Sequence, residues 1–310
     1  MKRLGFSRKE AAWGYLFISP WLVGFLFLMG GPIVVSLVLS LFKWDLLSPA
    51  RFIGFGNFAV MLRDRLFWQS LKVTGLFTAL SVPLSLVLGV MIAVLMNQKI
   101  PGISVLRTLY YLPSVVSGVA VSLLWVWVLH PDFGLLNLFL KVFGIRGPAW
   151  LQSPAWALPS LVVMSLWQVG GTMIIYLAGL QGIPTQLFEA AWIDGANRVQ
   201  TFTRITIPMI TPVLLYNVIV GIINALQVFT QPYIMTSGGP NNATLAYVMY
   251  LYQNGFQWFK MGYASALAWI LFLILLICTV LLLRSANAWV YYEGGTESFQ
   301  RSKHGARKPR

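Results

Sequence analysis

Four side-chain amides near the fifth hydrophobic segment are the first candidates for chemistry. They are Asn217, Asn224, Gln227 and Gln231. At about 100° per residue on an α-helix, all four fall within an arc of about 80°. Amides that faced lipid would leave hydrogen bonds unmade. This arc therefore indicates either a water-filled pathway or hydrogen bonding between helices, and the residues alone leave both alternatives open.

A second polar group lies in the fourth hydrophobic segment, where Trp167 precedes Gln168, Gly170, Gly171 and Thr172. An indole ring is a suitable platform for a sugar ring, and a neighbouring amide can hydrogen-bond to the sugar. The alternative is a tryptophan at the membrane interface beside glycines that let helices pack closely. Both interpretations remain open at this stage.

The loop between the fourth and fifth segments reads Glu-Ala-Ala-Trp-Ile-Asp-Gly-Ala over residues 189–196. It predicts a short helix that Pro184 opens and Gly195 ends. Its small alanines allow a partner surface to come close. Glu189, expected near the helix start, would be stabilised by the helix dipole and could pair with a basic group. The loop is either a docking element or an ordinary amphipathic surface helix. Pro208 and Pro212 are expected to open the span that follows.

Several activities are excluded by what the sequence lacks. No Gly-x-x-x-x-Gly-Lys-Ser/Thr loop occurs, so the chain is not expected to bind ATP in the usual way. The single cysteine, Cys278, and two distant histidines, His130 and His304, predict neither a disulfide nor a metal site. The net charge of +14 comes from basic residues in tails and loops, which favours membrane topology over nucleic-acid binding.

The elements that must position these residues are membrane helices. The chain has 310 residues, of which 58% are hydrophobic and 10% charged, so we expect an all-α polytopic membrane protein. Six segments are long enough to span a bilayer. They are Trp13–Phe42, Ser70–Met96, Leu106–Leu129, Pro154–Gly179, Met209–Thr230 and Ala264–Leu283. Their centres carry no Asp, Glu, Lys or Arg, which disfavours an ion-coupled carrier and places the energy source outside this chain.

Two of these segments carry further signals. The first is too long for one straight crossing, and Pro20 and Pro32 are expected to kink it. In the third, Ser114, Gly118 and Ser122 recur every four residues and predict a small-residue face for close helix packing.

The distribution of Lys and Arg predicts the orientation. With both termini inside, the inner segments hold 14 of these residues and the outer segments 8. We therefore expect a cytoplasmic N-terminus at residues 1–12, a membrane domain at 13–284 with an inner loop at 180–207, and a cytoplasmic basic tail at 285–310.

The loop motif, followed by Phe202, Ile205, Pro208 and Pro212, resembles the cytoplasmic signature of permease subunits of binding-protein-dependent ATP-binding cassette (ABC) importers. Further matches lie on both sides of it. They are Phe52–Phe58, Leu180–Pro184, Gly238–Asn242 and Gly262–Ala266. Together they cover nearly the whole chain and resemble the carbohydrate uptake branch, in particular the subunit related to the larger maltose permease or the first glycerol-phosphate permease. Compared with the maltose subunit, we expect neither extra N-terminal spans nor a large outer domain, and the loop at 43–69 is short.

The resemblance implies a type I ABC importer permease fold, with six transmembrane helices and a cytoplasmic coupling helix, in a bacterial or archaeal inner membrane. It implies four kinds of partner: a second related permease, two ATPase subunits that bind ATP and Mg, an extracytoplasmic solute-binding protein and the lipid membrane. The chain itself would be neither an enzyme nor the holder of a cofactor.

The resemblance also implies two sets of functional residues. The residues expected to couple to the ATPase are Glu189, Ala190, Ala191, Asp194, Gly195, Ala196, Phe202, Ile205 and Pro208. The residues expected along the substrate pathway are Trp167, Gln168, Gly171, Asn224, Gln227 and Gln231. The implied substrate is a sugar or oligosaccharide.

Three rival functions remain. An importer of glycerol-phosphate or another anionic solute is disfavoured because no basic residue lies in the midplane of the spans. An intramembrane enzyme is disfavoured because it would need a catalytic dyad or a metal set within the spans, and the sequence shows none there. A structural membrane protein is disfavoured because it would not need a docking loop on the cytoplasmic side.

Overall fold

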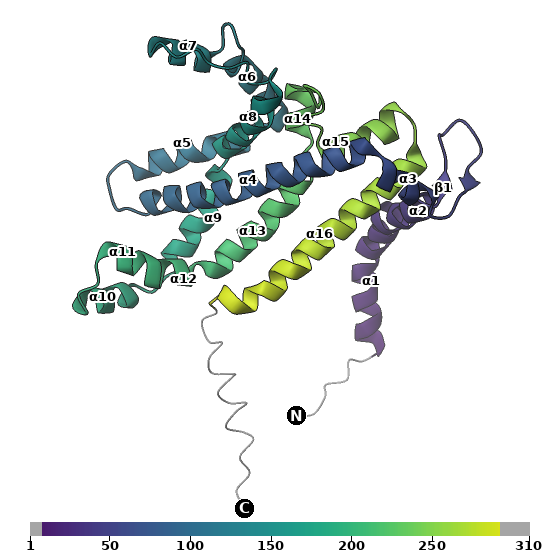
Figure 1. The fold of residues 1–310 in the computed structure, drawn as a ribbon. Helices are drawn as coiled ribbons and strands as arrows, with labels where there is room; N and C mark the ends of the chain where they lie inside the picture. The colour runs from purple at the N-terminus through teal and green to yellow at the C-terminus, as the bar shows by residue number, and fades with distance from the viewer. Residues whose placement is uncertain (1–7, 292–310) are drawn as a thin grey trace, which may run out of the picture. The chain divides into compact units, whose positions relative to one another are not determined.

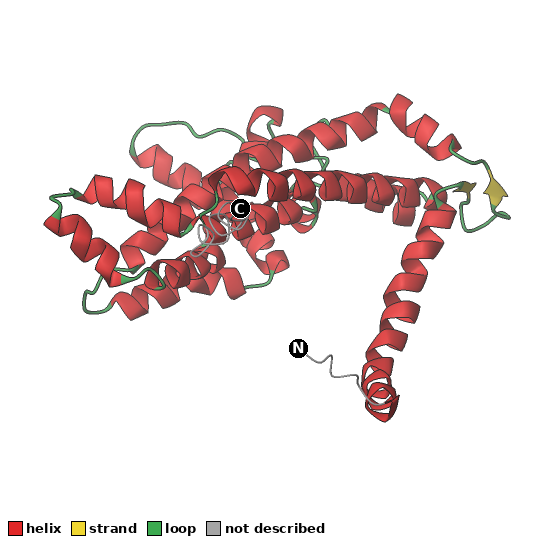
Figure 2. Cartoon of the chain, turned by 90° about the horizontal axis from the view of Figure 1, so that it is seen from below, coloured by secondary structure: helices red, strands yellow, loops and turns green. Residues whose placement is uncertain are grey.

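The computed structural model describes residues 8–291, and this part of the chain is predominantly helical (Figures 1 and 2). Its α-helices are α1 (Arg8–Gly24), α2 (Gly31–Leu39), α3 (Gly56–Arg63), α4 (Arg65–Met96), α5 (Ile103–Val115), α6 (Gly118–Val128), α7 (Leu135–Val142), α8 (Pro154–Trp167), α9 (Gly170–Gln181), α10 (Thr185–Ile193), α11 (Arg198–Thr201), α12 (Ile207–Met209), α13 (Thr211–Leu226), α14 (Thr230–Met235), α15 (Tyr247–Tyr252) and α16 (Met261–Trp289). Three π-helical turns span Phe25–Gly30, Phe202–Thr206 and Gln253–Gln257. Two short strands, β1 (Phe42–Lys43) and β2 (Arg51–Phe52), pair antiparallel. The predicted all-α class is confirmed.

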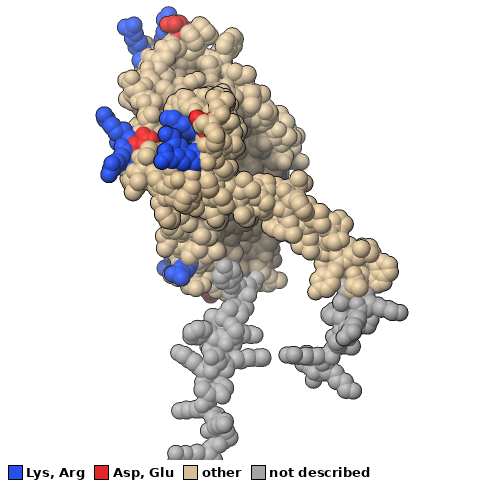
Figure 3. Space-filling view, turned by 90° about the vertical axis from the view of Figure 1, so that its right-hand side faces the viewer, with Lys and Arg blue, Asp and Glu red and all other residues tan. Residues whose placement is uncertain are grey.

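The predicted membrane spans correspond to long apolar helices. Within the described residues, four stretches are long and apolar enough to cross a bilayer: Ala12–Leu39, Arg65–Met96, Thr211–Met235 and Met261–Trp289. Two bent helix pairs, α5 with α6 and α8 with α9, bring the count to six if each pair is one span. Most of the face shown in Figure 3 carries no Lys, Arg, Asp or Glu, as a surface in contact with lipid requires.

The third span differs from the prediction of one helix over Leu106–Leu129. It is broken into α5 and α6, which are bent by 98°. Val116 and Ser117 have extended ψ angles of 139° and 133°, which end the helix, and Pro113 removes a backbone donor from its last turn. The predicted small-residue face is therefore also wrong, because Ser114 lies on a different helix from Gly118.

The first span is irregular between its two prolines. Pro20 lies within α1, whereas Pro32 lies in the first turn of α2, directly after the π-helical turn Phe25–Gly30. The backbone N–H of Gly31 donates to the carbonyl of Leu26 five residues earlier. This wider turn occurs next to the residue that has no N–H to donate.

The chain divides into two compact units. Within the described residues, the first comprises residues 8–65 and 251–273. Asn57 holds the start of its hairpin, since the amide Nδ2 donates to the carbonyls of Ser40 at 2.7 Å and Phe42 at 2.9 Å. The Tyr263 hydroxyl donates to Asp64 Oδ2 at 2.7 Å and so joins α16 to the end of α3.

The second unit comprises residues 66–250 and 274–291 of the described chain and holds the largest buried side chains. In its core, Met173 and Tyr176 of α9 pack with Val90 and Ala93 of α4 and with Ile210 before α13. Gly170 allows α9 to approach α5, because a Cβ at this position would overlap the carbonyl oxygen of Tyr110. Close helix approach through small residues is typical of packing in membranes.

Candidate functional site

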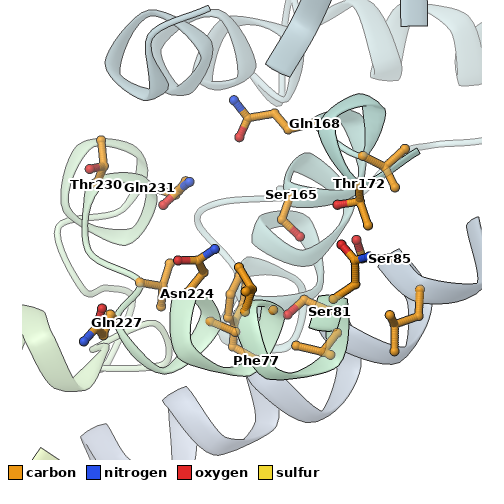
Figure 4. A pocket seen from close by; sticks show the side chains of 18 of the residues that line it. Phe77, Ser81, Ser85, Ser165, Gln168, Thr172, Asn224, Gln227, Thr230 and Gln231 are labelled. Carbon is orange, nitrogen blue, oxygen red and sulfur yellow. The ribbon is translucent and has the colours of Figure 1, made fainter. Parts of the chain in front are cut away.

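The second unit contains a cavity of about 410 Å³ that collects polar side chains from four parts of the chain (Figure 4). We call it the amide cavity. Its walls are α4, the junction of α8 and α9, α13, and the start of α14. The residues that line it are Phe77, Ser81, Val82, Ser85, Leu86, Ser165, Gln168, Val169, Thr172, Asn217, Val220, Gly221, Asn224, Ala225, Gln227, Val228, Phe229, Thr230 and Gln231. None of them is charged, so the cavity offers neutral donors and acceptors only.

Two helix breaks border the amide cavity. The axis bends by 47° between α8 and α9, and Gln168 and Val169 at this junction line the cavity. The chain also leaves the helical path between α13 and α14, and the three residues there, 227–229, line the cavity as well. Interrupted helices leave backbone groups without their usual partners, which membrane proteins tolerate where the backbone lines a cavity or is buried in protein. The two breaks place the side chains of Gln168 and Gln227 at the cavity.

The predicted convergence of the four amides is confirmed, although the continuous helix assumed for it is wrong. Asn217, Asn224, Gln227 and Gln231 all line the amide cavity. The helix nevertheless ends at Leu226, and Gln231 lies on α14. Asn217 is 7% exposed, and its Nδ2 donates to the carbonyl of Val213 in the same helix. Asn224 is exposed and keeps its amide available.

Two of the predicted pathway residues of the fourth segment line different cavities. Gln168 lines the amide cavity, whereas Trp167 lines a separate apolar cavity of about 300 Å³ beside α5. The Trp167 ring also meets the Trp125 ring edge-on, with centroids 6.1 Å apart. Consecutive helical residues point about 100° apart. The structure therefore does not join Trp167 and Gln168 into one sugar platform.

Gly171 is likewise placed outside the amide cavity. A Cβ at this position would lie 3.7 Å from the Cβ of Ser114 on α5. The packing alternative weighed for these glycines is thus the one the geometry supports.

Sequence reasoning missed the contribution of α4. Phe77, Ser81 and Ser85 follow one another at intervals of four residues and form one wall of the cavity. The available signal was a row of hydroxyls at helical spacing in a long apolar helix. Ser165 and Thr172 were also missed, and the hydroxyl of Ser165 is already bonded to the carbonyl of Val162 at 2.7 Å.

The predicted loop helix is present as α10 (Thr185–Ile193), with Pro184 directly before it. Gly195 ends it with a φ of +76°, a left-handed conformation that favours glycine. The N–H of Gly195 donates to the carbonyl of Trp192, and the N–H of Ala196 donates to the carbonyl of Ala191. These two bonds form a Schellman motif, which satisfies carbonyls at the helix end. The predicted start and stop are confirmed.

Glu189 is not at the helix start as expected. It is the fifth residue of α10, beyond the first turn, and its side chain is exposed. The start of α10 one residue after Pro184 moves Glu189 into the middle of this short helix. Its stabilisation by the helix dipole, predicted from the sequence, therefore does not apply.

The coupling signature separates into anchoring and exposed residues. Phe202 and Ile205, together with Phe188 of α10, pack against the core that contains Tyr176 and Ile210. The remaining half-buried members are Ala191, Ala196 and Pro208. The exposed members are Glu189, Ala190, Asp194 and Gly195. One part of the signature thus fixes the loop to the membrane helices, and the other faces away from them.

Large apolar side chains extend the exposed part of the loop. Trp192 is 67% exposed, Ile193 is 87% exposed and Val199 on α11 is 70% exposed. A protein surface that combines carboxylates with exposed aromatic and aliphatic side chains is typical of an interaction site.

The segment after α10 is held by local hydrogen bonds. Asn197 and Gln200 form a capping box in which each side chain accepts from the backbone N–H of the other at 2.9 Å. Pro212 lies in the first turn of α13 and opens the span as predicted, whereas Pro208 lies in the separate three-residue helix α12. The carbonyl of Pro208 accepts from the Thr211 hydroxyl at 2.6 Å. Within the second unit, this loop lies at the end opposite α6 and α7 (Figure 1).

Comparison with known proteins gives consistent results. The family model described as "Binding-protein-dependent transport system inner membrane component" matches residues 85–290. The chain is 42% identical to the probable ABC transporter permease protein YesP of Bacillus subtilis, over 96% of this chain and 97% of that protein. It is 34% identical to the trehalose/maltose transport system permease protein MalF of Thermococcus litoralis, over 89% of this chain and 94% of that protein. A chain from a bacterial alginate ABC transporter, solved in complex with an alginate pentasaccharide-bound periplasmic protein, shares the fold with a TM-score of 0.82 at 24% identity, over 92% of this chain and 97% of that chain.

Proposed function

Because the chain belongs to the family of binding-protein-dependent transport system inner membrane components, we propose that it imports a neutral sugar or oligosaccharide. It is the permease subunit of an ABC transporter and a multi-pass membrane protein with a type I importer fold. The solute arrives from an extracytoplasmic binding protein and passes through the amide cavity. The observation that carries the proposal is the uncharged lining of this cavity, where amides and hydroxyls meet at two helix breaks.

The choice of a neutral solute rests on electrostatics. An anion that entered a low-dielectric cavity without a cationic partner would lose its hydration and gain no ion pair in return. The amide cavity has no Lys, Arg or His in its lining. The names of the trehalose/maltose permease and of a lactose permease of Rhizobium radiobacter, 34% identical, support a sugar as the solute, whereas the choice of a neutral one rests on the cavity lining. The glycerol-phosphate alternative has no such support.

The energy for transport comes from partner subunits. We propose a complex of this chain with a second related permease and two ATPase subunits, which bind ATP and Mg. The exposed residues of α10 dock on one ATPase, while Phe188, Phe202 and Ile205 transmit its movement to the core of the second unit. The Schellman motif and the capping box keep the loop stiff enough for this role.

The orientation follows from the placement of Lys and Arg. Residues 1–12, the loop 180–207 and residues 285–310 lie on the cytoplasmic side, and 13–284 form the membrane domain. Much of the two terminal segments falls outside the described residues, so their assignment rests on the sequence alone.

Reconstitution tests the proposed function. The chain, its companion permease, the ATPases and the binding protein are placed in proteoliposomes and supplied with tritiated maltose, trehalose or lactose. We expect uptake of at least one sugar that depends on ATP and on the binding protein. Uptake of glycerol phosphate in the absence of uptake of any sugar would contradict the proposal. The variant Glu189→Lys serves as an uncoupled control, because it reverses the charge of an exposed residue that we propose to face the ATPase.

A further inference from the structure

One buried hydroxyl in the amide cavity has no partner. Ser81 on α4 is 6% exposed, and its Oγ makes no hydrogen bond within the described part of the chain. The other buried serines each donate to a backbone carbonyl; they are Ser40, Ser70, Ser122 and Ser160. An unsatisfied buried hydroxyl costs about 1–3 kcal/mol relative to a satisfied one. Ser81 is therefore an exception that needs a physical explanation.

The position of Ser81 supplies that explanation. It lines the amide cavity one helical turn after Phe77 and one turn before Ser85. Figure 4 shows Ser81 and Ser85 on one side of the cavity and Gln227 and Gln231 on the opposite side. A solute between these two sides would meet hydroxyls from α4 and amides from the α13–α14 break. A hydroxyl can both donate and accept, as a sugar hydroxyl can.

We propose that Ser81 is a specificity-determining contact that hydrogen-bonds one hydroxyl of the sugar in transit. This inference rests on the proposed function and adds the α4 wall to the predicted pathway residues. Because Ser81 Oγ is itself shielded from the cavity in this conformation, the serine side chain must rotate to meet the ligand, and the bond forms when the cavity is occupied. Discrimination against a sugar that lacks this hydroxyl follows, because a site built to bond a hydroxyl rejects an analogue without it.

The test uses the complete transporter in proteoliposomes, with whichever of tritiated maltose, trehalose and lactose the unmodified complex takes up. Ser81→Ala removes the hydroxyl, and Ser81→Thr retains one. From the usual net contribution of one hydrogen bond to binding, we expect Ser81→Ala to lower the uptake rate about 3- to 10-fold. Ser81→Thr should retain most of the uptake rate. Thermal unfolding of Ser81→Ala should occur at the same or a higher temperature, because no bond within the protein is lost.

Ser70→Ala is the matched control. Ser70 is a buried serine of the same helix, but its hydroxyl donates to the carbonyl of Phe67 at 2.8 Å and does not line the cavity. We expect this variant to unfold at a lower temperature and to show unchanged uptake per folded complex.

Monodeoxy derivatives of the same sugar identify the contact. The unmodified transporter should disfavour one derivative about 3- to 10-fold, and Ser81→Ala should not distinguish it from the parent sugar. Unchanged uptake by Ser81→Ala would overturn the inference and leave sugar import intact. A loss of uptake that accompanies a loss of stability would assign Ser81 a structural role and overturn it too. If the unmodified complex takes up none of the sugars, the proposed function itself fails.

Discussion

At the scale of single residues, the coupling signature contains two kinds of side chain. Phe202 and Ile205 are half-buried and pack against the core of the second unit, whereas Glu189 and Asp194 are exposed. Substitutions of exposed side chains usually change stability by less than about 0.5 kcal/mol, and truncation of a packed aromatic costs more. The two kinds of residue should therefore fail in different ways.

This difference gives the first prediction. Glu189→Ala should leave the melting temperature of the purified chain unchanged and lower the sugar-stimulated ATP hydrolysis of the reconstituted complex. Phe202→Ala should destabilise the chain by about 1–3 kcal/mol, less than full burial would cost, because the ring is only half-buried. Differential scanning fluorimetry and an ATPase assay provide the two readouts. Equal melting temperatures for the two variants would contradict the division into anchors and exposed contacts.

At the scale of elements, the second unit depends on how closely its broken spans pack. Gly170 starts α9 directly after the break and lies against the backbone of Tyr110 on α5. Backbone atoms cannot move aside as a flexible side chain can. A methyl group at this position would push α9 away from α5 and disturb the junction that lines the amide cavity.

Gly170→Ala is therefore expected to destabilise the chain by at least about 1–3 kcal/mol, the usual cost of overpacking. The matched control is Gly75→Ala in α4, where a Cβ would meet no atom within 4 Å. That variant should be neutral or slightly stabilising, because alanine is the better helix former by about 1 kcal/mol. Thermal melts in detergent measure both. A Gly170→Ala chain as stable as Gly75→Ala would show that α5 and α9 do not pack as described.

At the scale of the whole molecule, the proposed orientation assigns each loop to one side of the membrane. The β1–β2 hairpin is assigned to the outside, and the loop between α4 and α5 to the cytoplasm. Ser48 in the hairpin and Gln98 in the inner loop are both exposed and suit labelling.

In a Cys278→Ala background, we expect Ser48→Cys to react with a membrane-impermeant maleimide in right-side-out vesicles. Gln98→Cys should react only in inside-out vesicles. The opposite pattern would reverse the assigned topology, and the alanine background without a new cysteine serves as the unlabelled control.

Features that depend on local chemistry could be predicted from the sequence. Long apolar runs must form helices in a membrane because their backbone groups have no other partners there. For the same reason, the number of spans was predictable. Gly195 indicated the end of α10, because few residues other than glycine adopt its left-handed backbone conformation. The amide row indicated a polar site. Its residues do line one cavity, although α13 ends before Gln227.

Only the tertiary structure decided where the spans break and which side chains those breaks bring together. Hydrophobic periodicity does not encode the direction of a helix after an interruption, so the separation of Trp167 from Gln168 was not predictable. Nor was the buried, unpartnered state of Ser81, since burial depends on neighbours that are distant in sequence. The sequence by itself determined that the chain forms apolar helices that span a membrane. The packing of broken helices determined the shape and the hydrogen-bonding groups of the site.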